Sequence, residues 1–151
     1  MSKIIMVYAS MSGNTEEIAQ AIAEGVREEG AELEIKEVTQ VTAKELEEFD
    51  GILLGSYTWG DGELPDEFLE FYDNMDGVDL TGKIAGVFGS GDHAYIHFCA
   101  AVDQLQENVV QLGARLVQEG IKIEHSPSSA EEQLCNEFGK RFVNHLTSVE
   151  K

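Results

Sequence analysis

The chain has 151 residues, of which 42% are apolar and two are proline, a composition that predicts one folded domain with a substantial core and excludes a disordered tail. The formal net charge is −19, from 29 acidic against 10 basic residues. This charge argues against nucleic acid as a partner, because the phosphates would be repelled, and it fits either a basic protein partner or simple solubility.

Neither a membrane span nor a targeting segment is predicted. No apolar run is long enough to cross a bilayer, and the N-terminus lacks the basic region, apolar stretch and cleavage site of a signal peptide. We therefore expect a cytoplasmic protein. The two cysteines, Cys99 and Cys135, stand far apart and predict buried free thiols. The four histidines show no ligand spacing, so we predict no metal site.

Short apolar runs alternate with helical patterns along the first third of the chain. Residues 4–8 form a continuous apolar run, typical of a strand that is covered on both faces. Ile18, Ile22 and Val26 then recur at helical spacing, and Gly30 follows as a stop signal. The next predicted elements are a half-buried strand with Leu33, Ile35 and Val38, a short helix over 42–48, and a buried strand over 52–55.

The alternation continues to the end of the chain. Pro65 stands at a predicted first helical position, and residues 84–88 predict a fourth strand. The segments 115–117 and 121–123 together predict the last strand, and Ser129 with Glu132 predicts a capping box. Three apolar stripes predict the intervening helices: Phe68, Leu69, Tyr72 and Met75; Phe98, Val102, Leu105, Val109 and Leu112, ended by Gly113; and Leu134, Phe138, Phe142 and Leu146.

Strands that alternate with helices predict an α/β fold, in this case one doubly wound domain over residues 1–151 with a five-stranded parallel sheet. Such sheets bind ligands beyond the carboxyl ends of their strands, where the strand order reverses. The loops after the first, third and fourth strands are therefore the candidate site: residues 9–15, 56–63 and 89–97.

The first loop is rich in neutral hydrogen-bond donors. It leads into a helix, whose N-terminus offers backbone N–H groups and the positive end of the dipole. Ser10, Ser12, Asn14 and Thr15 add side-chain donors, and Gly13 permits a tight turn. A phosphate dianion can be held there without any basic side chain. The alternative is helix capping alone, but one cap needs one such residue, and four of them favour an anion site.

The other two loops carry aromatic residues. Trp59, the only tryptophan, lies in a loop with Gly60 and Gly62 and can stack on a planar ligand, or alternatively pack on its own loop. In the third loop Asp92 can accept a hydrogen bond from a ring N–H, and Tyr95 is a second aromatic, with burial in the core as its alternative. Together the loops predict a flat ligand with a phosphate tail, its ring held between Trp59 and Tyr95.

Several other ligand sites of this fold class are excluded by specific residues. Residues 10–15 hold one glycine, not the G-x-G-x-x-G of a dinucleotide site, and no Gly-Lys-Ser or Gly-Lys-Thr of a Walker loop is present. Gly89, Ser90 and Gly91 lack the outer spacing of a nucleophile elbow. A phosphoacceptor domain would carry an Asp at the end of the third strand, where this chain has Ser56 and Tyr57.

Over its whole length the sequence resembles the short-chain flavodoxins. Three motifs carry the resemblance: Ser10, Met11, Ser12, Gly13, Asn14 and Thr15 in the phosphate loop; Thr58, Trp59, Gly60 and Asp61 in the second; and Gly89, Ser90, Gly91 and Asp92, with Tyr95, Phe98 and Cys99, in the third. The resemblance implies the strand order 2-1-3-4-5 and a non-covalently bound flavin mononucleotide (FMN) that carries single electrons at low potential.

The resemblance also implies a role for individual residues. Ser10, Ser12, Asn14 and Thr15 would hold the phosphate. Trp59 and Tyr95 would flank the flavin ring, and Asp92 would meet its pyrimidine end. Gly60 would carry the peptide whose conformation changes when the flavin is reduced. The expected partners are basic-faced redox proteins, namely a ferredoxin/flavodoxin-NADP reductase and acceptor enzymes. The protein is expected to be a monomer.

Two alternative functions remain open at this stage. One is a small FMN-dependent NAD(P)H:quinone reductase of related fold, although such enzymes usually need extra loops and a dimer. The other is a flavin-free regulatory domain, which would purify without colour. The charge pattern suits a carrier that meets basic partners, since no Lys or Arg lies between Lys44 and Lys83, a window with eight acids from Asp61 to Asp79.

Overall fold

The computed structural model describes residues 3–9, 13–58, 64–91, 99–116, 118–124 and 127–150. Within these residues strands and helices alternate along the chain, with helices of the 3₁₀ type labelled η. The elements are β1 (Lys3–Ala9), α1 (Asn14–Glu28), β2 (Glu32–Glu37), η1 (Val38–Gln40), η2 (Ala43–Glu48), β3 (Gly51–Tyr57), α2 (Asp66–Asn74), β4 (Ile84–Gly91), α3 (Ala100–Gln111), β5 (Arg115–Leu116), β6 (Ile121–Glu124) and α4 (Ser129–Glu150).

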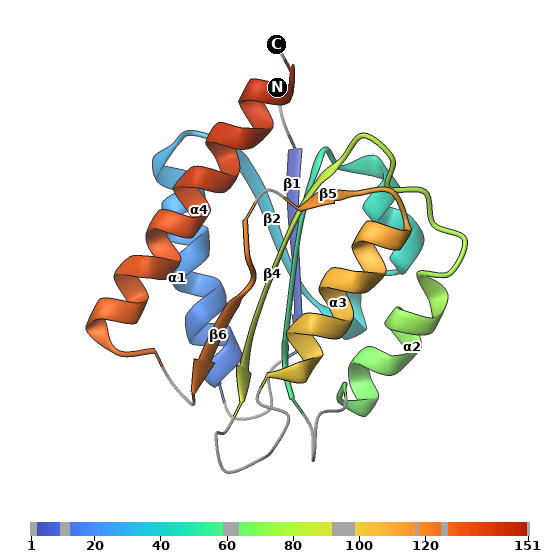
Figure 1. Ribbon diagram of the computed structural model, residues 1–151, viewed down its shortest axis with the longest axis horizontal. Helices are drawn as coiled ribbons and strands as arrows, with labels where there is room; N and C mark the ends of the chain where they lie inside the picture. Colours follow the sequence, from blue (N-terminus) through green and yellow to red (C-terminus); the bar gives the residue numbers. More distant parts are fainter. Residues whose placement is uncertain are drawn as a thin grey trace.

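The strands form one parallel sheet in the order β2-β1-β3-β4-β5, with β6 also paired to β4 (Figure 1). In its centre Ile5 lies opposite Ile52, and Ile52 lies opposite Ala85. The two short strands share the fifth position, because β5 pairs with the beginning of β4 and β6 pairs with its end. The predicted α/β fold and the strand order 2-1-3-4-5 are therefore confirmed.

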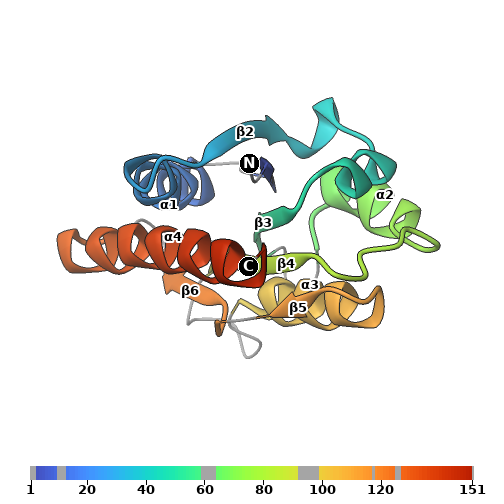
Figure 2. The same ribbon diagram turned by 90° about the horizontal axis from the view of Figure 1, so that it is seen from above.

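Helices cover both faces of the sheet, with α1 and α4 on one face and α2 and α3 on the other (Figure 2). This explains the continuous apolar runs, since both alternating sets of side chains in a strand must be buried. In β4, Ile84 and Phe88 join the cluster under α1 and α4, whereas Ala85 and Val87 join the cluster under α2 and α3. The two clusters form a core on each side of the sheet.

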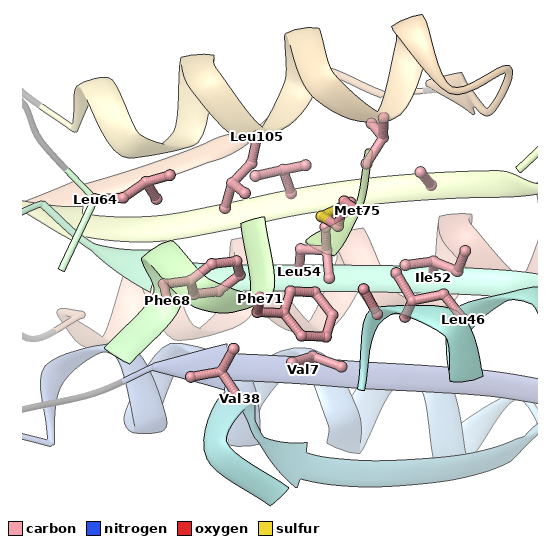
Figure 3. Close-up of a cluster of buried hydrophobic side chains, with 14 of the residues drawn as sticks. Val7, Val38, Leu46, Ile52, Leu54, Leu64, Phe68, Phe71, Met75 and Leu105 are labelled. Carbon is pink, nitrogen blue, oxygen red and sulfur yellow. The ribbon is translucent and has the colours of Figure 1, made fainter. Parts of the chain in front are cut away.

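The cluster under α2 and α3 is built around two phenylalanines of α2 (Figure 3). The rings of Phe68 and Phe71 meet edge to face, with 5.5 Å between centroids and 79° between planes. They pack with Leu54 of β3 and with Met75, all buried. Aromatic pairs of this geometry add stabilisation beyond the burial of their area, so they fix α2 beside the carboxyl end of β3.

On the opposite face α1 and α4 approach each other at two glycines. A Cβ atom on Gly25 would collide with the backbone oxygen of Asn136, and one on Gly139 would collide with the backbone oxygen of Ile22. The two helix backbones are therefore in direct contact at both places. A side chain at either glycine would force the helices apart.

Some element boundaries differ from the sequence prediction. Val38, predicted as strand, is the first residue of η1, where it is still buried. Pro65, predicted as the first helical residue, is the N-cap of α2, so the helix starts one residue later than predicted; the carbonyl of Pro65 accepts from the N–H groups of Phe68 and Leu69. The helix predicted over 42–48 is the 3₁₀ helix η2, with Thr42 as its N-cap.

The start of α4 differs by one residue from the prediction. Ser128, not Ser129, is the cap: its Oγ accepts from the N–H of Glu131, and the carboxylate of Glu131 accepts from the N–H of Ser128. Leu134, predicted to be buried, is 59% exposed, and Cys135 is buried instead. Successive helical residues are about 100° apart, so the stripe of Phe138, Phe142 and Leu146 centres near Cys135 rather than Leu134.

The thiols of Cys99 and Cys135 are both free and buried, as predicted. Among the described residues, no helix combines the length and the apolar composition that crossing a bilayer requires.

Candidate functional site

The carboxyl ends of β1, β3 and β4 meet at one edge of the sheet, the lower edge in Figure 1, where α1 also begins. Six predicted site residues are described there: Gly13, Asn14, Thr15, Thr58, Gly91 and Cys99. The other nine lie outside the described residues: Ser10, Met11, Ser12, Trp59, Gly60, Asp61, Asp92, Tyr95 and Phe98. The described residues therefore come from all three predicted loops and define where each loop begins or ends.

The N-terminus of α1 forms the first part of the site. Gly13 is the N-cap, and its φ of 90° lies in the left-handed region that favours glycine. Its carbonyl accepts from the N–H of Glu17 at 3.0 Å, which closes the first turn. Because glycine has no side chain, the cap position brings neither charge nor bulk to the end of the helix axis. The positive end of the helix dipole therefore favours an anion at this point.

The flank of α1 is much less suited to an anion. A hollow of about 500 Å³ runs along the helix from Gly13, and its lining includes Glu16, Glu17, Glu24 and Glu132. These carboxylates repel a phosphate. The structure therefore favours anion binding at the end of the helix axis, where backbone N–H groups point, and disfavours it along the side.

Thr15 lies on the buried side of the first turn of α1. It is fully buried, and its Oγ1 lies 2.8 Å from Oγ of Ser90, a residue 75 positions away in β4. Either hydroxyl can donate this hydrogen bond. The contact joins the phosphate loop to the strand that leads into the third loop. Ser90 carried no role of its own in the sequence analysis, because the alternation in β4 shows its face but not its partner.

Thr58 anchors the beginning of the second loop. Its backbone N–H donates to the carbonyl of Ser90 at 3.0 Å, and its Oγ1 accepts from the N–H of Ala101 at 3.4 Å. Ala101 lies in the first turn of α3, so Thr58 connects β4 to the helix that follows the third loop. The second and third loops are thus tied together at their bases.

Gly91 and Cys99 stand at the two ends of the third loop. Cys99 is the N-cap of α3 and has a left-handed φ of 51°, which is rare for a residue with a side chain. Its Sγ lies 4.0 Å from the carbonyl oxygen of Gly89 and 3.8 Å from that of Ile123. Burial raises the pKa of the Cys99 thiol to about 12, so the sulfur stays protonated and can donate. The residue thus acts as packing at the loop base, not as a nucleophile.

Tyr57, at the end of β3, carries a further polar contact that the sequence analysis did not find. Its hydroxyl donates to Oε1 of Glu67 at 3.1 Å, which ties α2 to the strand end. Burial, together with this hydrogen bond, raises the pKa of Tyr57 to about 12, so the phenol is neutral at physiological pH. The neighbouring Ser56 is fully buried and donates to the carbonyl of Tyr57 at 2.8 Å.

In the part of the chain that the structure describes, no group of three His, Cys, Asp or Glu side chains is arranged to hold a metal ion. His145 is exposed on α4, and the other three histidines lie outside the described residues. The donors that the described residues offer at this edge of the sheet are hydroxyls and backbone N–H groups, which suit a phosphate.

A family model described as flavodoxin matches residues 6–139. The chain is 44% identical over 144 residues to probable flavodoxin 2 of Bacillus subtilis, with 95% of each chain covered. It is 40% identical over 134 residues to a flavodoxin of Maridesulfovibrio salexigens, covering 87% of this chain and 92% of that one. The crystal structure of oxidised flavodoxin 1 from Bacillus cereus superposes with a TM-score of 0.93 at 52% identity, covering 95% of this chain and 99% of that one.

Proposed function

Because this chain belongs to the flavodoxin family, it is an FMN-binding electron carrier, and we propose that its three strand-end loops hold the FMN and that it passes electrons to basic-faced redox proteins. When bound, FMN supplies the flavin ring that accepts and releases electrons. The observation that carries the proposed phosphate site is the N-terminus of α1. Its N-cap, Gly13, has no side chain, and Thr15 adds a hydroxyl in the first turn.

The described residues fit FMN in the chemistry of their donors. Backbone N–H groups of α1 and the hydroxyl of Thr15 favour a phosphate monoester, and Asn14 adds a side-chain amide in the same turn. We assign the same task to Ser10, Met11, Ser12 and Gly13 by family membership. A second, adenylate-bearing phosphate has no evident site among the loop residues of the sequence.

Family membership also supports roles for residues outside the described part of the chain. Trp59 and Tyr95 flank the flavin ring in this proposal, Asp92 meets its pyrimidine end, and Gly60 carries the peptide that responds to reduction. Asp61 and Phe98 complete these two loops. Thr58, Gly91 and Cys99 hold the loops at their bases, a role supported by the contacts of Thr58 with Ser90 and Ala101.

Titration of the apoprotein with flavins tests the proposed site. FMN should bind much more tightly than riboflavin or flavin adenine dinucleotide, and the fluorescence of Trp59 should be quenched as FMN is added. Equal affinities for FMN and riboflavin would show that α1 does not hold the phosphate.

The partner side of the proposal starts from the acidic surface of α2. Asp66, Glu67, Glu70 and Asp73 belong to this helix, which begins beside the second loop. With the absence of Lys and Arg between Lys44 and Lys83, they favour a basic partner such as a ferredoxin/flavodoxin-NADP reductase. We further propose that the protein has no substrate turnover of its own. A steady-state assay with NAD(P)H and a quinone tests this point, and sustained turnover without a reductase would overturn it. The monomeric state and the location in the cytoplasm stay predictions.

A further inference from the structure

Ser90, near the carboxyl end of β4, touches segments that lead to all three loops. The residue is 3% exposed. Its hydroxyl contacts that of Thr15 in α1, and its carbonyl accepts from the N–H of Thr58. The residue itself is followed by Gly91, after which the third loop begins. One buried residue thus contacts the start of α1 through its side chain and the second loop through its backbone.

The strand alternation explains why this side chain meets α1. Ile84 and Phe88 of β4 belong to the cluster under α1 and α4, and Ser90 follows them at the same two-residue period. On the helix, Thr15 precedes Ile18 and Ile22 on the buried face. The two hydroxyls therefore lie between the sheet and the helix, at the point where α1 begins.

A hydroxyl has one proton to donate and two lone pairs to accept with. If Thr15 gives its proton to Ser90, it has no proton left for a phosphate. If Ser90 donates instead, Oγ1 of Thr15 accepts and its own proton is available to an anion at the helix end. The 2.8 Å contact is compatible with both directions, and only the second lets Thr15 serve the phosphate.

We propose that Ser90 is a positioning residue of the phosphate site: its hydroxyl donates to Thr15 and thereby directs the proton of Thr15 to the phosphate of FMN. This inference rests on the proposed function, in which α1 holds that phosphate. Ser90 acts through Thr15 and does not itself touch the phosphate. Its effect is therefore specific to flavins that carry the phosphate and disappears when Thr15 is replaced by a residue without a hydroxyl.

The experiment is a double-mutant cycle that measures the dissociation constants of FMN and riboflavin for each apoprotein. The variants are Ser90→Ala, Thr15→Val and the double variant. Ser56→Ala is the matched control, because it removes an equally buried hydroxyl at the same edge of the sheet. Ser56 was predicted to lie at the start of the second loop, but the structure places it within β3, and its hydroxyl bonds to the carbonyl of Tyr57 and not to α1. Thermal unfolding of each apoprotein separates general stability from ligand binding.

We expect Ser90→Ala to weaken FMN binding about three- to tenfold, because the proton of Thr15 is then no longer directed to the phosphate, and to leave riboflavin binding unchanged. Thr15→Val should weaken FMN binding about ten- to a hundredfold, and adding Ser90→Ala to it should cause no further loss. Ser56→Ala should leave the FMN-to-riboflavin ratio at its parent value.

The outcomes separate the two proposals. If Thr15→Val weakens FMN binding selectively but Ser90→Ala does not, the role of Ser90 is wrong and the phosphate site stands. The same conclusion follows if Ser90→Ala has an equal effect in the parent and in the Thr15→Val background. If Thr15→Val leaves the FMN-to-riboflavin ratio unchanged, the roles of Thr15 and Ser90 are wrong, whereas the phosphate site at α1 is overturned only if the parent protein binds FMN and riboflavin equally. A loss of FMN and riboflavin affinity by the same factor in Ser90→Ala would show a merely structural residue.

Discussion

Gly91 and Cys99 are packed so closely that a Cβ atom on Gly91 would lie 2.9 Å from the sulfur of Cys99 and 3.0 Å from its backbone nitrogen. The two residues flank the segment 92–98, so their contact fixes where the third loop leaves the sheet and where it returns. The φ of Gly91 is not in the left-handed region, and its glycine is required by this contact rather than by backbone conformation.

Gly91→Ala should therefore displace Cys99 and the start of α3, cost about 1–3 kcal/mol in the free energy of unfolding, and weaken FMN binding. Gly86→Ala in the same strand is the matched control, because its Cβ would press on the side chains of Leu53 and Phe138, away from the loops. Denaturant unfolding and FMN titration of both variants check this. Equal FMN affinities for the two variants would contradict a role of the Gly91–Cys99 contact in the site.

The two thiols predict how stability changes at alkaline pH. Burial raises the pKa values of Cys99 and Cys135 to about 12 in the folded protein, above the value of about 8.5 expected in the unfolded chain. Between these values the unfolded state has lost protons that the folded state retains, so stability must fall as pH rises from about 9 to 12. Below about pH 8 the thiols should contribute no pH dependence.

Chemical denaturation across this pH range checks the thiol prediction. Relative to its own value at pH 7, the free energy of unfolding of Cys135→Ala should fall less steeply with rising pH than that of the parent. A disulfide reagent should react with native protein far more slowly than with unfolded protein, because both thiols are buried. Rapid reaction of the folded protein, or an unchanged slope in Cys135→Ala, would contradict the prediction.

The acidic surface of α2 predicts an effect of salt on electron transfer. The rate with a basic-faced reductase should fall as ionic strength rises from about 0.01 M to 0.15 M, because the Debye length falls from about 30 Å to 8 Å. The double variant Asp66→Asn/Glu70→Gln should flatten this dependence. It should also raise the potential at which the second electron is accepted, because α2 begins beside the second loop, which holds the flavin ring in the proposed function, and fewer negative charges then lie near that ring.

A second double variant controls for the change in net charge. Glu48→Gln/Glu107→Gln neutralises the same number of exposed acids on η2 and α3, outside α2. In stopped-flow and potentiometric measurements, the salt dependence of the rate and the potential for the second electron should be close to those of the parent in this control. If the α2 variant and the control respond alike, the acids of α2 serve only solubility.

Because α1 and α4 touch at Gly139, a substitution there is predicted to lower the stability of the fold. Gly139→Ala would place a Cβ against the backbone oxygen of Ile22, which no side-chain rotation can relieve. We expect a loss of about 1–3 kcal/mol in the free energy of unfolding despite the better helix propensity of alanine, which would favour the variant by about 1 kcal/mol at an open site. Gly120→Ala is not a suitable control for this variant, because a Cβ atom on Gly120 would also be crowded by its neighbours. Thermal unfolding checks this, and a stabilised variant would contradict the contact.

The apolar pattern was enough to predict the layers and the order of the elements. Residues 4–8 favoured a strand buried on both faces, and the spacing of Ile18, Ile22 and Val26 favoured a helix that packs against the sheet, as the structure has them. The exact ends of the helices were harder to predict, because two adjacent residues can fit the same capping position. Ser128 and Ser129 both fit a capping box, and which of them caps α4 is decided by where the chain enters the helix, not by residue type.

The site was predictable as a set of loops, but not as a set of contacts. Gly13 could be anticipated, because a tight turn into a helix favours glycine. The pairing of Thr15 with Ser90 could not, since it joins residues 75 positions apart and depends on how α1 packs against β4. The same holds for the contacts of Thr58 with Ser90 and Ala101, which require the folded sheet edge.

The glycine contacts between α1 and α4 also affect the other end of α1. Gly25 is twelve residues from Gly13, which corresponds to about 18 Å of helix. Because the two backbones touch at Gly25 and Gly139, α1 can neither slide along α4 nor rotate against it without a collision. The helix end at Gly13 is therefore held at a fixed height above the sheet before any ligand arrives. An anion that binds there does not have to order the helix, and less of its binding energy is lost to conformational entropy.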